Sequence, residues 1–310
     1  MERKIVVEAK GLSKRFDDHQ VIKGIHFEVN QGECFGILGP DGSGKSTLMK
    51  MMYGAFALNG GELFISGLNL RENLREIKAR IGVLTQDDGF EESFTVRENL
   101  SVFGSYFGIP GEGLIRRTEE LLKLVRLEDL GDQLVAYLDV GMKRRLAMAQ
   151  ALIHSPEILI LDEPSSRMDA AGRSWMWDFL KKIKDQMGTV ILTTRYMEEA
   201  EKVCDRIAIL DRGEILAIGE PQNLIRDLIG WQVIDFVLKP TDIKYYLSRL
   251  SSQKFRYQVL DDQVQVHLQT PEDTQKALSL VQSMRVTIRQ PTLSDVFLKL
   301  AGHRLREEPL

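Results

Sequence analysis

A glycine-rich stretch of nine residues, GPDGSGKST at 39–47, constrains this 310-residue chain more than any other feature. It lies between a short apolar run, CFGIL, and a helix-like stretch, LMKMMYG. Glycines at this spacing let successive backbone N–H groups curve round an anion without Cβ clashes. A helix that begins there directs the positive end of its dipole at the same point. The pattern therefore predicts a phosphate-binding loop at a strand-to-helix turn, with a nucleoside triphosphate as its ligand.

The residues of this loop have expected contacts with the nucleotide. Lys45 reaches the β- and γ-phosphates, and the Ser46 hydroxyl faces Mg²⁺. The alternative is a glycine-rich turn that binds nothing, but the strand before it and the helix after it favour the phosphate site. The remaining candidates for nucleotide binding are Gly39, Pro40, Asp41, Gly42, Ser43, Gly44 and Thr47.

A second apolar run, EILILDEP at 157–164, ends in two adjacent carboxylates. We expect Asp162 to hold Mg²⁺ through its water ligands, and Glu163 to orient or deprotonate the attacking water. Standing alone, the segment would be interpreted as a buried strand whose polar end begins a turn at Pro164. Together with the phosphate loop, it predicts a nucleoside triphosphatase.

Composition and charge exclude several other classes. The formal net charge of −4 gives no overall basic bias, so we expect no nucleic-acid partner. Cys34 and Cys204 show neither metal-ligand spacing nor a disulfide framework, which is typical of a reducing cytoplasm. The first ten residues lack the apolar core of a signal peptide, and no apolar run reaches the length of about 18 residues that spans a bilayer.

Strand and helix periodicities alternate along the chain and predict an α/β fold of the P-loop NTPase type with a largely parallel core. Apolar positions at helical spacing predict a helical subdomain at about 88–155. Near residues 226–232 the pattern restarts, so we expect an ATP-binding domain at 1–228 and a C-terminal accessory α+β domain at 229–310. The β-α-β-β-α-β order of the latter suggests a small ferredoxin-like module.

The order of these motifs resembles that of the ATP-binding subunits of ABC transporters, over essentially the whole chain. Phe16 lies where that family stacks an aromatic ring on adenine, and Gln86 lies at the glutamine that senses Mg²⁺ and contacts the membrane partner. The segment LDVGMKRRLAMAQAL precedes the carboxylate-bearing strand as the family's signature does. The closing PTLSDVFLKLAG is similar to the drug-resistance and nodulation-factor exporters. Alone, Phe16 would be interpreted as a core aromatic and Gln86 as a solvated strand end.

The resemblance implies an ABC ATPase with ATP and Mg²⁺ as cofactors, and with Ser46, Gln86 and Asp162 at the metal. It implies a homodimer or heterodimer that closes around ATP, in which Asp139 and Gly141 of the signature face the nucleotide of the other subunit. Separate transmembrane permease subunits are the implied partners. The chain would then be a peripheral subunit of an exporter on the cytoplasmic side of the inner membrane.

Three departures from the family pattern bear on activity. Asp139 and Val140 stand where a serine and a glycine are usual, so a carboxylate would face an anion. The alternative is that Asp139 serves as the N-cap of the following helix. Arg195 stands where the family has its switch histidine; it can donate to a phosphate but cannot accept a proton. Alternatively, Arg195 faces solvent and pairs with Glu198 or Glu199.

Two hypotheses for function follow. The leading one is an ATP-hydrolysing subunit that drives a membrane exporter, with Glu163, Gln86 and Arg195 as the catalytic candidates. The altered signature and switch then predict slow turnover, or asymmetric hydrolysis in a heterodimer. The alternative is a catalytically weak or non-hydrolysing ATP-binding regulatory subunit.

Overall fold

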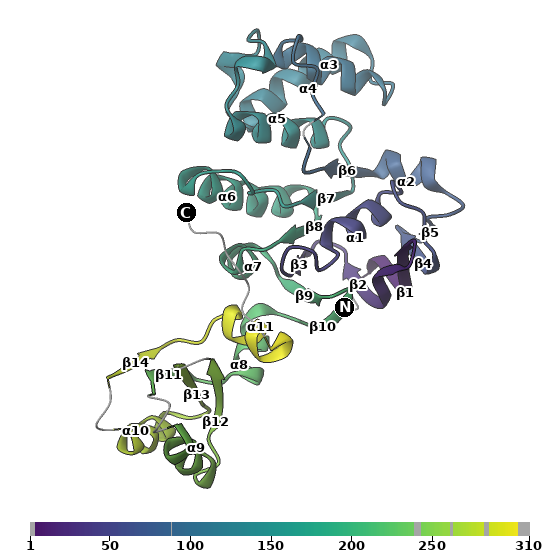
Figure 1. Ribbon diagram of the computed structural model, residues 1–310. Coiled ribbons are helices and arrows are strands. Elements are labelled where there is room, and N and C mark those ends of the chain that lie inside the picture. Colours follow the sequence, from purple (N-terminus) through teal and green to yellow (C-terminus); the bar gives the residue numbers. More distant parts are fainter. Residues whose placement is uncertain (1–3, 88, 239–242, 261–262, 282–284, 303–310) are drawn as a thin grey trace. The chain divides into compact units, whose positions relative to one another are not determined.

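The computed structural model describes residues 4–87, 89–238, 243–260, 263–281 and 285–302 (Figure 1). Contacts divide the chain into two compact units, Met1–Ala217 and Ile218–Leu310. Two helices expected in the second unit, at 241–250 and 271–282, reach into residues that lie outside the described ranges. Among the described residues, no helix combines the length and the apolar character that crossing a bilayer requires.

A six-stranded sheet runs through the first unit in the order β10-β9-β3-β8-β7-β6. The four neighbouring pairs from β9 to β6 are parallel. Every residue of β3, β7 and β8 is buried, as expected for parallel strands with both faces covered. This confirms the predicted α/β class with a parallel core. The strands are β3 (Cys34–Leu38), β6 (Ile81–Leu84), β7 (Ile158–Asp162), β8 (Thr189–Thr194), β9 (Arg206–Asp211) and β10 (Glu214–Gly219).

A second, antiparallel sheet has the order β2-β1-β4-β5. Its main feature is a hairpin of two strands of 12 residues each, longer than the alternating runs at 4–10 and 26–31 indicate. Register shifts interrupt the pairing at several points, including Ala9 to Leu12, and they break the two-residue period. The strands are β1 (Ile5–Phe16), β2 (His19–Asn30), β4 (Gly60–Ile65) and β5 (Leu68–Asn69).

Helices α3, α4 and α5 pack on one another and form the predicted helical region; Figure 1 shows them grouped beyond β6. A capping box begins α3, where the Thr95 side chain accepts from the Glu98 N–H and Glu98 accepts from the Thr95 N–H. The helices of this unit are α1 (Lys45–Met52), α2 (Leu74–Arg80), α3 (Val96–Ser105), α4 (Gly111–Leu124), α5 (Val140–Leu152), α6 (Ala170–Met187) and α7 (Met197–Val203), with 3₁₀ turns at Glu128–Leu130 and Val135–Tyr137.

The second unit contains a four-stranded antiparallel sheet in the order β12-β13-β11-β14. The order β-α-β-β-α-β expected for a ferredoxin-like module is present. One sheet face and helices α9 and α10 supply an apolar core that includes Ile234, Phe236 and Val266. The elements are α8 (Pro221–Leu228), β11 (Gln232–Val237), α9 (Ile243–Ser252), β12 (Arg256–Leu260), β13 (Gln263–Leu268), α10 (Pro271–Leu280), β14 (Val286–Arg289) and α11 (Leu293–Ala301).

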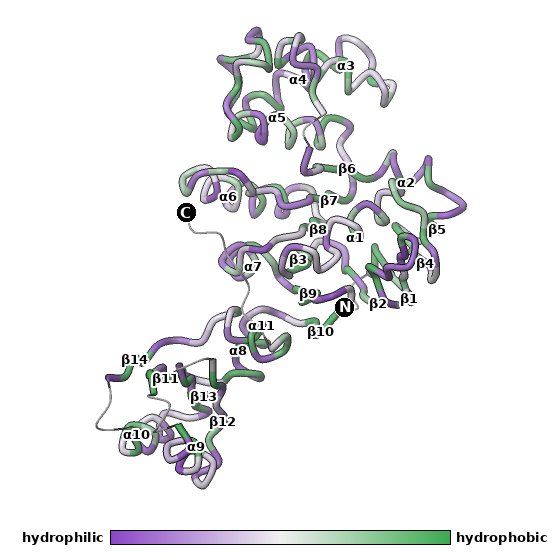
Figure 2. Tube along the Cα trace, in the orientation of Figure 1, coloured by the Kyte–Doolittle hydropathy of each residue, from purple (hydrophilic) through white to green (hydrophobic). Residues whose placement is uncertain are grey.

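Helix α11 begins at a capping box and packs against α8, and Figure 2 colours much of it as hydrophobic. Arg289 at the end of β14 donates to Asp235 at 2.6 Å and, through two nitrogens, to both oxygens of Asp295 at 2.7 Å. The Asp295 side chain is only 4% exposed. Burial opposes its ionisation, but the hydrogen bonds from Arg289 and Thr292 and the charge of Arg289 together outweigh burial and lower the pKa of Asp295. This bridge holds the start of α11 to the sheet.

Candidate nucleotide-binding site

The glycine-rich loop links buried strand β3 to helix α1. Its first residue, Gly39, donates its N–H to the Thr194 carbonyl at 3.3 Å, so the loop is fastened to the end of the neighbouring strand β8. A Cβ at Gly39 would lie 2.2 Å from the Leu210 carbonyl oxygen, which excludes a side chain there. Gly42 and Gly44 adopt φ values of 79° and 109°, where glycine is strongly favoured. The backbone conformation therefore requires the glycines at these positions.

A pocket of about 320 Å³ lies on this loop. Gln86, which follows β6, and Glu163, which follows β7, reach the same pocket from distant parts of the sequence. The loop residues Gly39, Pro40 and Ser43 shape the turn, with the Ser43 N–H donating to the Pro40 carbonyl at 3.1 Å. The residues that line the pocket are Val21, Asp41, Gly42, Gly44, Lys45, Ser46, Thr47, Gln86 and Glu163.

Lys45 is the buried cation of this pocket, with a side chain 4% exposed. Its Nζ donates to the carbonyls of Gly39 at 2.9 Å and Pro40 at 3.0 Å. It also lies 3.6 Å from Oε1 of Glu163. Burial lowers the pKa of Lys45, while the carboxylates of Glu163 and Asp41 oppose that shift. Lys45 thus lines the pocket with the carboxylates of Asp41 and Glu163 near its ammonium group.

Three oxygen-bearing side chains meet beside Lys45. Ser46 Oγ donates to Asp162 Oδ1 at 3.2 Å, and Gln86 Nε2 donates to Ser46 Oγ at 3.4 Å. Thr193 Oγ1 donates to the same Asp162 oxygen at 2.6 Å, which fixes the carboxylate. Hydroxyl, carboxylate and amide oxygens are ligands that Mg²⁺ prefers, so this group fits the metal expected with a nucleotide.

Glu163 adopts φ 46°, a left-handed conformation that is uncommon for a residue other than glycine. Its N–H donates to Thr193 Oγ1 at 2.9 Å. Arg144 on α5 donates to its carbonyl at 2.8 Å and to the carbonyls of Asp162 at 2.7 Å and Pro164 at 3.0 Å. The strained turn that carries Glu163 is therefore held from two sides.

Sequence reasoning missed Arg144. It is only 4% exposed and also donates to the Thr85 carbonyl, immediately before Gln86. The sequence did hold a signal, because Arg144 lies close to the apolar residues Leu146 and Ala147 in a predicted helix. An arginine buried among such residues needs hydrogen-bond acceptors nearby. Which carbonyls it meets depends on the packing of α5 against the ends of β6 and β7.

Arg195, immediately after β8, lies beside Asp41, which lines the pocket. Its Nη1 is 3.2 Å from Asp41 Oδ2, and its Nη2 donates to the Tyr196 hydroxyl at 3.4 Å. The Tyr196 hydroxyl bond, followed by the charges around it, raises the pKa of Arg195 above its already high ordinary value. Glu199, one of the alternative partners, is completely buried and accepts from Trp177 Nε1 at 3.0 Å.

The signature residues lie at the start of α5 and are not among the residues that line this pocket. Asp139 Oδ1 accepts from the Met142 N–H at 2.7 Å, so the interpretation of Asp139 as the N-cap is confirmed. Val140 is 51% exposed, and Gly141 follows it in the first turn. The signature thus faces outward within one chain.

Phe16, the candidate adenine platform, is at the exposed end of β1. Phe16 is 39% exposed. The centre of its ring lies 5.2 Å from the centre of the Phe56 ring, and the two rings meet edge to face. Lys14 Nζ lies 4.9 Å from the Phe16 ring centre. The ring is therefore available for stacking and is not part of the core.

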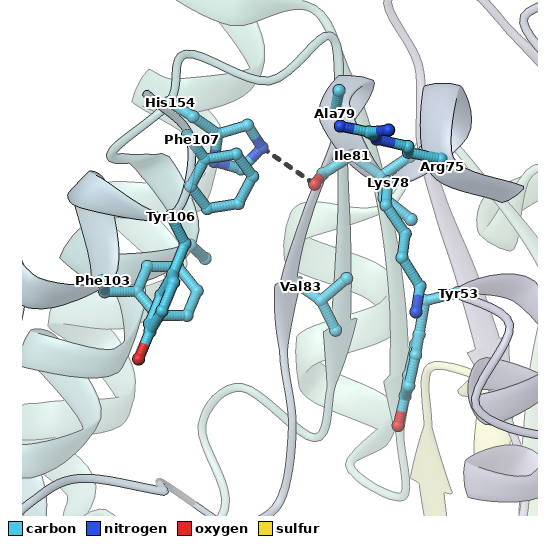
Figure 3. A pocket seen from close by; sticks show the side chains of 11 residues that line it. Tyr53, Arg75, Lys78, Ala79, Ile81, Val83, Phe103, Tyr106, Phe107 and His154 are labelled. Atoms are coloured by element: carbon cyan, nitrogen blue, oxygen red, sulfur yellow. Dashed lines mark hydrogen bonds between the residues drawn. The ribbon is translucent and has the colours of Figure 1, made fainter. Parts of the chain in front are cut away.

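A second, larger pocket of about 500 Å³ lies at the helical region (Figure 3). Aromatic residues of α3 and its end form one side, including Phe103 and Phe107, and the cations Arg75 and Lys78 of α2 lie on the other. His154 stacks on Phe107 with ring centres 3.9 Å apart, and its Nε2 lies 3.0 Å from the Ile81 carbonyl oxygen. Burial lowers the pKa of His154. This apolar groove with a cationic rim is separate from the phosphate loop.

The fold and the site define a P-loop nucleoside triphosphatase. A family model described as ABC transporter matches residues 22–166. The Nod factor export ATP-binding protein I of Rhizobium sp. (strain N33) is 38% identical over 305 residues, covering 98% of this chain and 99% of that protein. Its counterpart from Rhizobium meliloti (strain 1021) is 39% identical, covering 98% and 90%. The chain belongs to the ABC transporter family, as an ATP-binding subunit with the ATPase activity of that family.

Solved structures agree with this assignment. The ATP-binding cassette MJ0796, in a dimeric post-hydrolysis state bound to ADP and Pi, has a TM-score of 0.64 and 25% identity, covering 69% of this chain and 98% of that one. CbiO1 from Clostridium perfringens, part of the ABC transporter complex cbiONQ, has a TM-score of 0.66 and 24% identity, covering 81% and 98%. The second likeness supports the ABC cassette fold.

Proposed function

We propose that this chain binds Mg-ATP on the loop 39–47 and hydrolyses it to drive a separate membrane exporter. The observation that carries the proposal is the convergence of Lys45, Ser46, Gln86 and Glu163 on one pocket. The phosphate groups would lie against the loop amides, with Lys45 neutralising their charge. Phe16 would stack on the adenine, since its ring is exposed.

Ser46, Gln86 and Asp162 would hold Mg²⁺, which when bound neutralises charge on the β- and γ-phosphates. Glu163 is the proposed general base. It is 11% exposed at the pocket, and the Thr193 and Arg144 hydrogen bonds fix the backbone that carries it. Its carboxylate would accept a proton from the attacking water or orient that water.

Two copies of this chain, or this chain and a related subunit, would close around ATP. Because Asp139 and Gly141 lie outside the pocket of their own chain, they would act on the nucleotide held by the other subunit. A carboxylate there faces phosphate charge, and two unit charges about 4 Å apart repel by about 4 kcal/mol at an effective dielectric near 20. We therefore propose slow or asymmetric hydrolysis, relieved when the partner supplies an intact signature.

Transmembrane permease subunits are the proposed partners, and the part of segment 89–107 that lines the larger pocket is their proposed contact. The groove in Figure 3 supports this, because Phe103, Tyr106 and Phe107 line it and Tyr106 is 79% exposed. Phe94 lies in the same segment and is 38% exposed, but it does not line the groove. Phe103→Ser should reduce recruitment to membranes that contain the permease, whereas Phe94→Ser is the matched control.

The curated relatives are described as exporting Nod factor, and we carry over the direction of transport alone. The chain would then act as a peripheral subunit on the cytoplasmic face of the inner membrane. The net charge of −4 also supports a role without nucleic acid.

The test is Mg-ATP hydrolysis by the purified chain, alone and with its permease, with Glu163→Gln as the blank. Turnover at least about 10-fold above the blank is expected, because a positioned general base contributes roughly 100-fold or more. Turnover equal to the blank, with Mg-ATP still bound, would contradict hydrolysis. Failure to bind Mg-ATP at all would contradict the whole proposal.

A further inference from the structure

The phosphate loop and the switch position are joined by an ion pair within one chain. Asp41 lies in the loop, and its carboxylate accepts from Arg195, which follows β8, at 3.2 Å. The backbone also brings the two residues together. The Gly39 N–H donates to the Thr194 carbonyl at 3.3 Å, and this backbone bond fastens the residue before Arg195 to the start of the loop.

The two members of this pair differ in their surroundings. Arg195 is 17% exposed, whereas Asp41 is 70% exposed. On its other side the guanidinium contacts Tyr196, with the hydroxyl 3.4 Å from Nη2 and the ring centre 5.4 Å from the guanidinium carbon. Tyr196 therefore orients the arginine independently of Asp41. An ion pair with so exposed a carboxylate is weak, because water screens it.

A stronger acceptor for this guanidinium would be a phosphate. Guanidinium groups bind phosphate oxygens through two parallel hydrogen bonds, and a terminal phosphate carries more negative charge than one carboxylate. Asp41 lines the nucleotide pocket, and Lys45 Nζ lies 3.9 Å from its other oxygen. A phosphate bound there would face the Asp41 carboxylate and compete with it for both cations.

We propose that Asp41 is a competing acceptor that holds Arg195 beside the pocket, and that Arg195 exchanges it for the terminal phosphate of a nucleoside triphosphate. The exchange of one acceptor for another makes the pair a sensor that distinguishes a triphosphate from a diphosphate. This inference rests on the proposed function, since it presumes that nucleotide occupies the pocket.

The test is a double-mutant cycle on the full chain, with dissociation constants for Mg-AMPPNP and Mg-ADP measured by calorimetry. In Asp41→Asn, no carboxylate competes for the guanidinium, so AMPPNP affinity should rise by about 3- to 10-fold while ADP affinity changes by less than about 2-fold. Arg195→Gln should weaken AMPPNP by a similar factor. In the Arg195→Gln background, Asp41→Asn should give no gain, because nothing remains to be released.

Three further variants sharpen the cycle. Asp18→Asn is the matched control, because it removes an exposed carboxylate that pairs with Arg15 at 2.9 Å and should leave both affinities unchanged within about 2-fold. Arg195→Lys keeps the positive charge but lacks the planar guanidinium with its parallel N–H donors. Its ratio of AMPPNP to ADP affinity should lie between those of the wild type and Arg195→Gln. Asp41→Ser replaces Asp41→Asn if the latter does not fold.

An equal gain from Asp41→Asn in both backgrounds would overturn the proposal, because Asp41 would then act on the phosphates directly. Equal effects on AMPPNP and ADP would overturn it as well, since the pair would not sense the terminal phosphate. A wild-type chain that binds neither nucleotide refutes the proposed function itself. The two failures are therefore distinguishable.

Discussion

Replacing Arg144 by methionine tests how the turn that carries Glu163 is held. The substitution keeps an unbranched side chain but removes the donors to the carbonyls of Asp162, Glu163 and Pro164. Since Arg144 is 4% exposed, water has little access to replace those bonds. The turn would then keep its left-handed residue without one of its two supports.

The expected cost follows from these contacts. A hydrogen bond from a charged donor contributes about 1.5–3 kcal/mol, and burying the guanidinium offsets part of that gain. A buried carbonyl that loses its donor costs roughly 1–3 kcal/mol, and several carbonyls lose theirs together, for a total of about 3 kcal/mol after that offset. We expect Arg144→Met to lower the free energy of unfolding of the first unit by about that amount. Relaxation of Glu163 should also lower kcat by at least about 10-fold.

Urea unfolding and steady-state hydrolysis measure the two effects, and Mg-AMPPNP binding should stay within about 3-fold because the phosphate loop keeps its own contacts. The control is Arg145→Met at the next position, whose guanidinium lies 4.4 Å from the Trp175 ring centre. That change should cost about 1 kcal/mol. Wild-type stability and kcat in Arg144→Met would refute the reasoning.

Three other predictions follow from single sites. Arg289→Gln should destabilise the second unit by about 3 kcal/mol, read from faster amide exchange of α11, because the buried Asp295 loses its partner. The pKa of Asp295 is lowered in the folded state, so this difference should shrink as pH falls below about 4 and the carboxyl is protonated. The pKa of His154 is lowered in the folded state, so the unfolded chain binds the imidazole proton more readily. The free energy of unfolding should therefore decrease as the pH is lowered from about 7 to 5. This decrease should be less steep in His154→Gln than in a His26→Gln control. Asp139→Ser should keep the N-cap and raise turnover, and an unchanged rate would show that its charge does not limit hydrolysis.

Local motifs made the nucleotide site predictable. The residues from Gly39 to Thr47 are contiguous, and their backbone geometry follows from glycine spacing in a strand-to-helix turn. The position of Asp162 and Glu163 at a strand end was predictable in the same way, because a buried parallel strand leaves a continuous apolar run that ends at its carboxylates. The N-cap role of Asp139 likewise depends on a residue three positions away.

The full β1–β2 hairpin was less predictable, because bulges break the two-residue period on which strand recognition depends. The helical region and the order of the C-terminal elements were predictable in outline, since their apolar periodicity is strong. Sequence proximity did suggest Glu199 as a partner for Arg195, but Glu199 is buried and accepts from Trp177.

The sequence alone determined that this chain builds a phosphate loop followed by an α/β core, because those properties depend on residues within a few positions of each other. Tertiary structure decided which distant groups meet. Arg195 lies beside Asp41 because parallel strands β3 and β8 are neighbours, and Arg144 reaches Glu163 because α5 packs on the strand ends. Such contacts depend on strand order and helix packing, which the spacing of residues along the chain does not specify.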